Sequence, residues 1–166
     1  MMKPLLFSLS LLLCALPVSA QIGWSMVASA GEIDESSLVL YDYNGARLQF
    51  QNGADGSIVA RYPVTNTPGS AAGTQTPPWD IFRITYIDTS AASSVSARLM
   101  SVDECSGAEE ELCEVTSGTT GGTPGCAFCI FPPDIDFGGN AYYIEATVER
   151  SSLAVDPVLV MMSLSH

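Results

Sequence analysis

Residues 142–149 have the sequence Tyr-Tyr-Ile-Glu-Ala-Thr-Val-Glu, in which side chains that favour burial alternate with side chains that favour water. Successive side chains of a β-strand point to opposite faces of its sheet, so this alternation predicts a strand. We expect Tyr142, Ile144, Ala146 and Val148 to face the core of the domain. The residues between them should face solvent.

The same period of two recurs along the chain, where β-branched and aromatic runs are separated by clusters of Gly, Asn, Asp and Pro. Asn44-Gly45 supplies the positive φ angles of a tight hairpin turn, and the cluster at 52–56 predicts a second turn. No segment has the pattern of a long amphipathic helix. We expect strands at 24–29, 38–41, 46–51, 58–64, 79–87, 95–100, 110–116, 142–149 and 158–162.

These strands, about nine in number, predict an all-β fold with two packed sheets. We therefore expect a two-sheet antiparallel β-sandwich of the jelly-roll or immunoglobulin-like type, with a disulfide-stapled loop.

Residues 1–20 have the pattern of a secretory signal peptide: a basic head with Lys3, an apolar run over 5–18, and the small-residue motif Val18-Ser19-Ala20. The apolar run is shorter than the roughly 20 residues of a membrane-spanning helix, so we expect no membrane span. Cleavage would leave residues 21–166 as a single domain, secreted or held at the cell surface after export of the bacterial kind. It would also remove Cys14 and the only lysine of the chain.

The chain is strongly acidic, with 18 Asp and Glu against six Lys and Arg and a formal net charge of −12. Such a charge repels phosphate backbones, which excludes nucleic acid as a partner. Calcium binding is the alternative interpretation of the acidic composition, because the carboxylates of Asp134 and Asp136 share one side of an extended segment. No segment has the full pattern of a calcium-binding loop, and we expect no cofactor.

The segment 103–139 is rich in Cys and poor in apolar residues, and it is expected to form a long loop that carries Cys105, Cys113, Cys126 and Cys129. Export places these cysteines in an oxidising compartment, so disulfides are expected. Four cysteines allow three pairings. The turn residues after Cys105 favour Cys105 with Cys113, and Cys126 with Cys129. A crossed or nested pairing remains the alternative.

Two other roles for these cysteines are disfavoured. The spacing of the four is wide for a zinc site, which also needs free thiolates. A redox Cys-x-x-Cys opens a helix, whereas Phe128 to Pro133 favours an extended segment.

Most catalytic chemistry lacks its residues here. His166 is the only histidine and ends the chain, which argues against nucleophilic triads and histidine-ligated metals. The absence of lysine from the mature chain argues against Schiff-base and phosphate-binding chemistry. Carboxylates remain, so the candidates for a polysaccharide hydrolase are Asp80, Asp134, Asp136, Glu145 and Glu149. We expect a protein that is not an enzyme.

The leading hypothesis is a secreted, non-catalytic structural or interaction protein that self-assembles by edge-strand pairing, with itself, another extracellular protein or a glycan as partner. The expected assembly strand is uniformly apolar and comprises Val158, Leu159, Val160, Met161 and Met162. The first alternative is a glycan-binding module, with or without calcium, that uses the aromatic residues Trp24, Trp79, Tyr41, Tyr43 and Tyr62. The second is a carboxylate-dependent polysaccharide hydrolase.

Overall fold

The computed structural model describes residues 23–66, 76–132 and 135–166. The expected signal peptide and Asp134 lie outside these residues. Two short 3-10 helices, η1 (Ala28–Ala30) and η2 (Glu35–Ser37), interrupt an otherwise all-β chain. The strands are β1 (Trp24–Val27), β2 (Glu32–Ile33), β3 (Tyr41–Asn44), β4 (Arg47–Phe50), β5 (Gly56–Val64), β6 (Ile81–Ile87), β7 (Ser93–Asp103), β8 (Glu109–Thr116), β9 (Gly125–Ile130), β10 (Asn140–Arg150) and β11 (Val158–Ser165).

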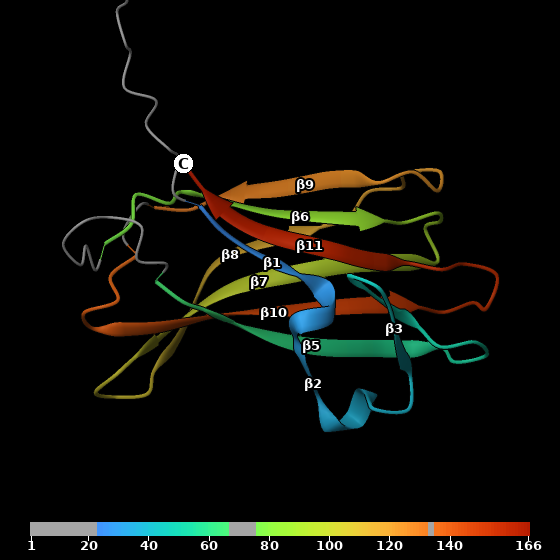
Figure 1. Cartoon of the computed structure of the whole chain (residues 1–166), viewed down its shortest axis with the longest axis horizontal. Helices are drawn as coiled ribbons and strands as arrows, with labels where there is room; N and C mark the ends of the chain where they lie inside the picture. The colour runs from blue at the N-terminus through green and yellow to red at the C-terminus, as the bar shows by residue number, and fades with distance from the viewer. Residues whose placement is uncertain (1–22, 67–75, 133–134) are drawn as a thin grey trace, which may run out of the picture.

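The strands form two antiparallel sheets, which confirms the predicted β-sandwich. Sheet A has the order β3-β4-β11-β6-β9, with β1 also paired to β11, and sheet B has the order β2-β5-β10-β7-β8. In Figure 1, β9, β6 and β11 lie side by side in the upper half of the view, and β10 and β5 lie in the lower half.

The pairing of eight of the strands follows a nested pattern. β4 pairs with β11, β5 with β10, β6 with β9, and β7 with β8. One long hairpin that is wound over a sandwich gives this order, and the result is a jelly roll. Of the two sandwich types expected from the sequence, the structure has the first.

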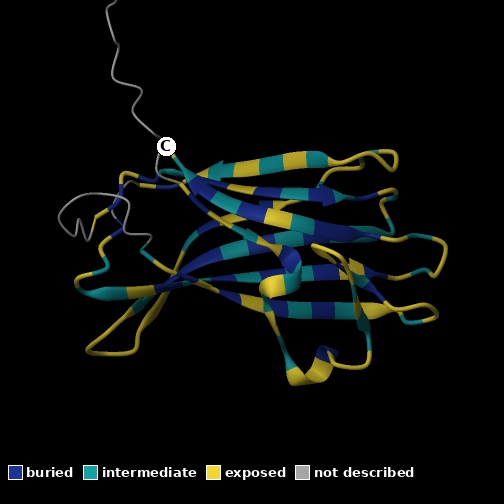
Figure 2. Cartoon of the chain, viewed as in Figure 1, coloured by how far each residue is buried: buried dark blue, intermediate teal, exposed yellow. Residues whose placement is uncertain are grey.

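The core lies between the inner faces of the two sheets. Tyr142, Ile144, Ala146 and Val148 are all buried, which confirms the inward face predicted for residues 142–149. Figure 2 shows the same alternation as bands of buried and less buried residues along the strands. Burying a large aliphatic side chain contributes about 1.5–3 kcal/mol, so the period of two in the sequence drives the two sheets together.

The turn of the first hairpin lies one residue later in the chain than the sequence suggested. Gly45 has a φ of 63°, as the turn requires, but Asn44 pairs with Arg47, so the two-residue loop is Gly45-Ala46. The predicted strand at 38–41 is wrong over residues 38–40, which lie in the turn that follows η2, where Leu38 and Val39 are exposed. Strand β3 begins only at Tyr41.

The segment 103–139 is not the long loop that was expected. It holds β8, which was predicted at 110–116, and β9, which was not predicted. Strand β9 lacks the usual pattern of large apolar residues facing inward, because its core-facing residues include the small Ala127 and Cys129, whereas Phe128 and Ile130 face outward.

The favoured disulfide pairing is also wrong, because the structure joins Cys113 of β8 to Cys129 of β9, with their Cα atoms 6.2 Å apart. Cys126 and Cys129 are three residues apart in a strand and therefore point to opposite faces, so they cannot bond to each other. Cys105, in the turn after β7, and Cys126 are free and exposed. The disulfide belongs to the crossed alternative, and it joins the edge strands of the two sheets.

The expected assembly strand lies inside a sheet. Residues 158–162 belong to β11, which pairs with β6 along its length and with β4 and then β1 on its other side. Val158, Leu159 and Met162 are buried, and Val160 and Met161 are less so. The uniformly apolar run therefore belongs to a strand that has neighbouring strands on both sides over most of its length, and it is not a free edge.

Arg150 is a buried charge at the end of β10, and its guanidinium joins two loops. Its Nε donates to the carbonyl of Ala54 (2.6 Å), its Nη2 to that of Gln51 (3.1 Å) and its Nη1 to that of Val155 (3.1 Å). Asp156 supplies a counter-charge, and the guanidinium lies 4.6 Å from the centre of the Phe50 ring. The burial of this charge is tolerated because its donors are satisfied.

No helix among the described residues is long and apolar enough to cross a membrane.

The disulfide closes a loop with a sequence separation of 16 residues. We expect the double variant Cys113→Ser/Cys129→Ser to lose about 3 kcal/mol of unfolding free energy in urea, because the open loop gains entropy in the unfolded state. The matched control is Cys105→Ser/Cys126→Ser, which removes two exposed thiols and should leave the urea midpoint unchanged. Equal losses in the two double variants would contradict the observed pairing.

Replacing Arg150 should destabilise the fold more than replacing an exposed arginine. Arg150→Met removes the donors of three loop carbonyls and should lower the unfolding free energy by about 2–3 kcal/mol. Arg83→Met, on the exposed face of β6, is the control and should change it by less than about 0.5 kcal/mol. Thermal and urea unfolding measure both, and a stability of Arg150→Met equal to that of the control would refute the role of Arg150.

Candidate functional site

The outer face of sheet B carries a row of charges that crosses all five of its strands. Register pairs Glu32 of β2 with Arg61 of β5, Arg61 with Glu145 of β10, Glu145 with Arg98 of β7, and Arg98 with Glu114 of β8. Residues that pair directly across antiparallel strands share a face, so these five side chains form one line of alternating sign. We call these five residues the charge row.

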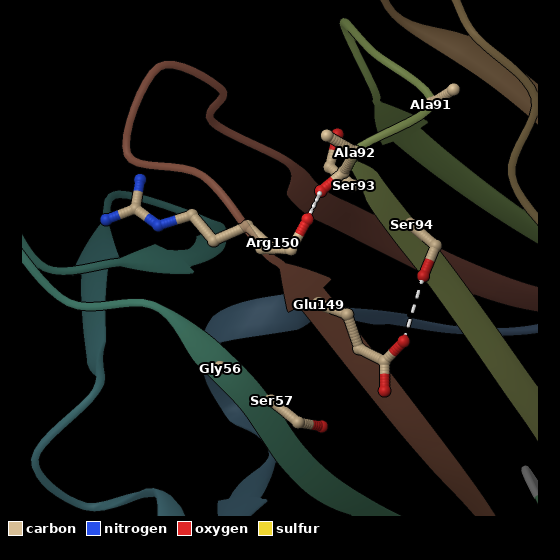
Figure 3. A pocket seen from close by; sticks show the side chains of 9 residues that line it. Gly56, Ser57, Ala91, Ala92, Ser93, Ser94, Glu149 and Arg150 are labelled. Carbon is tan, nitrogen blue, oxygen red and sulfur yellow. Dashed lines mark hydrogen bonds between the residues drawn. The ribbon is translucent and has the colours of Figure 1, made fainter.

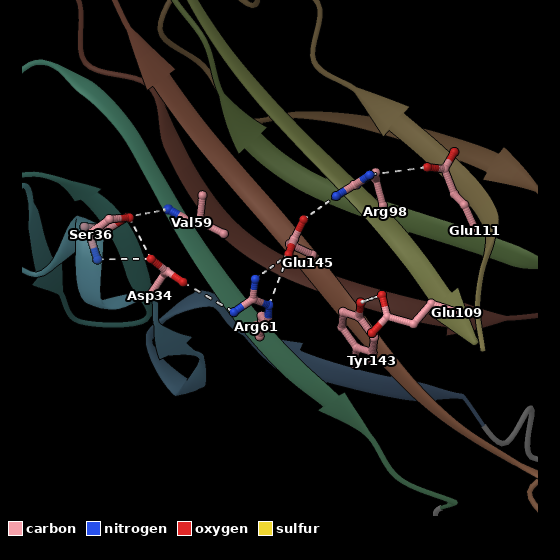
Figure 4. Close-up of polar contacts among 10 residues, drawn as sticks. Asp34, Ser36, Val59, Arg61, Arg98, Glu109, Glu111, Tyr143 and Glu145 are labelled. Atoms are coloured by element: carbon pink, nitrogen blue, oxygen red, sulfur yellow. Dashed lines mark hydrogen bonds and ion pairs between the residues drawn. The ribbon is translucent and has the colours of Figure 1, made fainter. Parts of the chain in front are cut away.

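Glu145 is the centre of the charge row, held between two arginines (Figure 4). The Nε and Nη2 of Arg61 donate to its Oε2 at 3.0 and 2.9 Å, and Arg98 donates to its Oε1. The side chain of Glu145 is 14% exposed, whereas those of Arg61 and Arg98 are 51% and 42% exposed. The carboxylate is therefore anchored and the guanidinium groups remain open to solvent.

Two further acids extend the network at its ends. Arg61 also contacts Asp34 (Nη1 to Oδ2, 3.4 Å), and Arg98 contacts Glu111 (Nη1 to Oε2, 3.7 Å). Partial burial raises the pKa of Glu145, but the hydrogen bonds from Arg98 and Arg61 outweigh it and hold this pKa below its usual value. The same bonds raise the pKa of both arginines. The network is consequently charged throughout the neutral range.

Next to the charge row, Tyr143 lies between Pro63 of β5 and Met100 of β7, its direct partners across the sheet. Its hydroxyl donates to Oε2 of Glu109 (3.3 Å), which orients the ring. Burial of the ring raises the pKa of this hydroxyl, with a further contribution from Glu109. The hydroxyl is thus a neutral donor at physiological pH.

Tyr143 and the central part of the charge row line a shallow groove of about 590 Å³ on the outer face of sheet B. The groove combines an aromatic ring and the apolar side chains of Pro63 and Met100 with guanidinium and carboxylate groups. An arrangement of this kind offers stacking to an apolar surface and hydrogen bonds to a polar rim.

A second hollow of about 460 Å³ lies beside the ends of β5, β7 and β10 (Figure 3). Its lining is mainly Gly, Ala and Ser, with Glu149 hydrogen-bonded to Oγ of Ser94 (3.3 Å). The side chain of Arg150 points away from it, toward the loops that it joins. This hollow lacks an aromatic ring and a cluster of converging polar groups, so the groove is the better candidate.

The aromatic residues proposed from the sequence lie elsewhere. Trp24, Trp79 and Tyr62 are buried in the core, and the Tyr62 hydroxyl donates to the carbonyl of Ala28 (2.8 Å). Tyr41 and Tyr43 contact each other on β3, with ring centres 5.0 Å apart. None of the five lines the groove. The tyrosine that does, Tyr143, was missed although the alternation at 142–149 placed it on the solvent side.

The acids proposed for hydrolysis are not brought together. Asp80 contacts His166 (Oδ2 to Nδ1, 3.2 Å), and Asp136 accepts from the backbone of Gly138 (2.8 Å) in a turn. Glu145 and Glu149 share a face of β10, but Glu145 is bound to arginines. Over the described ranges, no group of three or more His, Cys, Asp or Glu could hold a metal ion.

No protein-family model matches the chain, and no curated protein sequence matches it. Solved structures that are similar to it include a carbohydrate esterase and two carbohydrate-binding modules. A family two carbohydrate esterase from Cellvibrio japonicus is 9% identical, with a TM-score of 0.45 over 88% of this chain and 33% of the esterase chain. The chain thus spans about a third of the esterase's length.

The other two are carbohydrate-binding modules. The C-terminal family 22 module of Clostridium thermocellum Xyn10B is 15% identical, with a TM-score of 0.43 over 85% of this chain and 84% of that one. TmCBM61 in complex with beta-1,4-galactotriose is 13% identical, with a TM-score of 0.42 over 89% of this chain and 90% of that one. Likenesses of this size carry no information about what the present chain binds.

The charge row predicts a specific pH dependence of stability. Since the pKa of Glu145 is lowered in the folded state, its contribution is present above its unfolded pKa of about 4.3 and is lost as the pH falls through the folded value. Glu145→Gln should lower the unfolding free energy by about 1–2 kcal/mol at pH 7. The difference from wild type should shrink as the pH falls below about 4.

Urea unfolding at pH 7 and at pH 3 measures this difference. Glu149→Gln is the control, because it lies on the same face of β10 and bonds to Ser94 instead of an arginine. A deficit of Glu145→Gln that stays constant with pH would rule out the charged pairs as its cause.

Proposed function

We propose that the protein is a non-catalytic glycan-binding module and that its binding site is the groove on the outer face of sheet B. The observation that carries the proposal is the position of Tyr143 directly beside a row of paired arginines and glutamates on one rigid sheet face. A sugar ring has an apolar face of C–H groups and a rim of hydroxyls. The groove presents a partner for each.

The ring of Tyr143, flanked by Pro63 and Met100, supplies the surface for the apolar face of a sugar. The open guanidinium groups of Arg61 and Arg98 supply donors, since each has five N–H groups. Glu145 supplies acceptors and holds both arginines in place. Because these groups are ordered before a ligand arrives, binding would lose little side-chain entropy.

The sign of the charge row favours neutral glycans. Acids outnumber arginines in it, and Asp34 and Glu111 add further negative charge at its ends. A sulfated or uronic-acid-rich glycan would be repelled by these acids and by the net charge of the chain. The ligand class that fits is therefore a neutral oligosaccharide with free hydroxyls.

The state of Glu145 supports a non-catalytic role. The general acid of a glycoside hydrolase needs a raised pKa so that it is protonated at working pH. Here two arginines lower the pKa of the one acid at the centre of the groove. The Cys113–Cys129 disulfide supports an oxidising, extracellular location, where glycans are accessible.

Binding to an array of neutral and anionic oligosaccharides, followed by calorimetry on the best neutral ligand, tests the proposal. Tyr143→Ala should weaken binding by about tenfold or more, because it removes the stacking surface. Leu153→Ala is the control, since Leu153 is an exposed apolar residue outside the groove, and it should bind like wild type. Unchanged affinity in Tyr143→Ala, or binding to no neutral glycan, would overturn the proposal.

A further inference from the structure

We propose that two copies of the protein associate by antiparallel pairing of their β9 strands, which extends sheet A across a two-fold axis. This proposal is independent of the glycan site, which lies on the other sheet. It replaces the assembly strand expected from the sequence, since β11 has no free edge over most of its length.

The edges of the two sheets are protected against pairing, with one exception. Natural edge strands avoid edge-to-edge association by being very short or by carrying charge. Strand β2 has two residues, β1 and β3 have four each, and β8 carries Glu109, Glu110, Glu111 and Glu114. Strand β9 has six residues, Gly-Cys-Ala-Phe-Cys-Ile, and none is charged. Among the strands that end the two sheet orders in the described part of the chain, β9 alone has neither protection.

The outer face of β9 is also apolar and open. Phe128 and Ile130 are 60% and 70% exposed, and the free thiol of Cys126 lies on the same face. Across to the neighbouring strand β6, Phe128 pairs with Arg83, Ile130 pairs with Ile81, and Cys126 pairs with Thr85. An uncharged strand that exposes a phenylalanine and an isoleucine and contains no proline has the composition of a pairing segment.

The absence of charge on β9 allows a second copy of the chain to be the occupant, although the chain as a whole is acidic. Two molecules of net charge −12 repel each other, and a contact through β8 would bring its glutamates against those of the other copy. A β9–β9 contact brings no like charges together at the paired strands. Antiparallel pairing of one strand with its copy is also self-complementary, which closes the assembly as a dimer.

The disulfide prepares this edge for pairing. Cys129 of β9 is bonded to Cys113 of β8, so the free edge of one sheet is tied to the edge of the other. An edge that is already ordered loses less entropy when it accepts a partner strand than a loose one does.

The register of the dimer follows from the pleat. Directly paired residues share a face, so Cys126, Phe128 and Ile130 must pair with the same three residues of the other copy. The register that pairs all three of these residues with one another places Phe128 opposite its own copy on the two-fold axis. Cys126 then lies opposite Ile130 of the other copy, at each of two symmetric positions.

Sedimentation velocity of the purified chain over a range of concentrations tests the dimer, with a charge swap at its centre. Phe128→Glu and Phe128→Lys should each raise the dimer dissociation constant by about tenfold or more, because like charges meet on the axis. An equimolar mixture of the two variants should restore the dimer. Leu153→Glu, at a residue 58% exposed on another part of the surface, should leave it unchanged.

A second measurement tests the register. Ile130→Cys places a thiol opposite Cys126 of the other copy, so diamide should oxidise these two thiols to a disulfide and take up their two protons and two electrons. The covalent dimer should appear on a non-reducing gel, whereas Leu153→Cys should give much less. Within one chain the two thiols are four residues apart along a strand, about 13 Å, which is too far for a bond.

The proposal is overturned by a wild-type chain that stays monomeric up to its solubility limit, by an oligomer that Phe128→Glu leaves intact, or by equal effects of the Phe128 and Leu153 variants. None of these results would bear on the proposed glycan site, because that site lies on sheet B and is tested separately with Tyr143→Ala.

Discussion

Burial of one face of each sheet is the constraint on which this structure depends. Strands β5 and β7 both pair with β10, and all three send their alternate residues into one core. Because each inward residue dictates the direction of its neighbour, the same alternation that builds the core decides what the outer faces present. Those faces differ. Sheet B presents arginines, glutamates and Tyr143, whereas sheet A presents the uncharged strand β9 at its edge.

The alternation explains how much of the fold the sequence predicts. Tyr142, Ile144, Ala146 and Val148 are inward as expected, and the two-sheet sandwich follows from repeating that pattern. Cross-sheet relations are not local, so the sequence does not predict them. The bond between Cys113 and Cys129 joins strands whose proximity depends on the winding of the whole jelly roll. Strand β11 was misjudged for the same reason, since only its neighbours reveal that it is internal.

The candidate site was predictable in part. Once residues 142–149 are taken as a strand, Tyr143 and Glu145 must lie on its solvent face. What the sequence does not contain is the register that sets Arg61 and Arg98 on either side of Glu145. The buried tyrosine Tyr62 and the outward Tyr143 have the same local context of alternating strand residues. Their different roles depend on which face each strand turns to the core.

The disulfide between β8 and β9 makes the sandwich asymmetric with respect to opening. One long side of the jelly roll is closed by a covalent bond, whereas the opposite side is bordered by the short strands β2 and β3. Local opening should therefore begin at β2 and β3 and proceed toward the bonded side, as amide hydrogen exchange would record. The two sheets would then separate from the side of β2 and β3, and β8 and β9 would be the last strands to lose their contact.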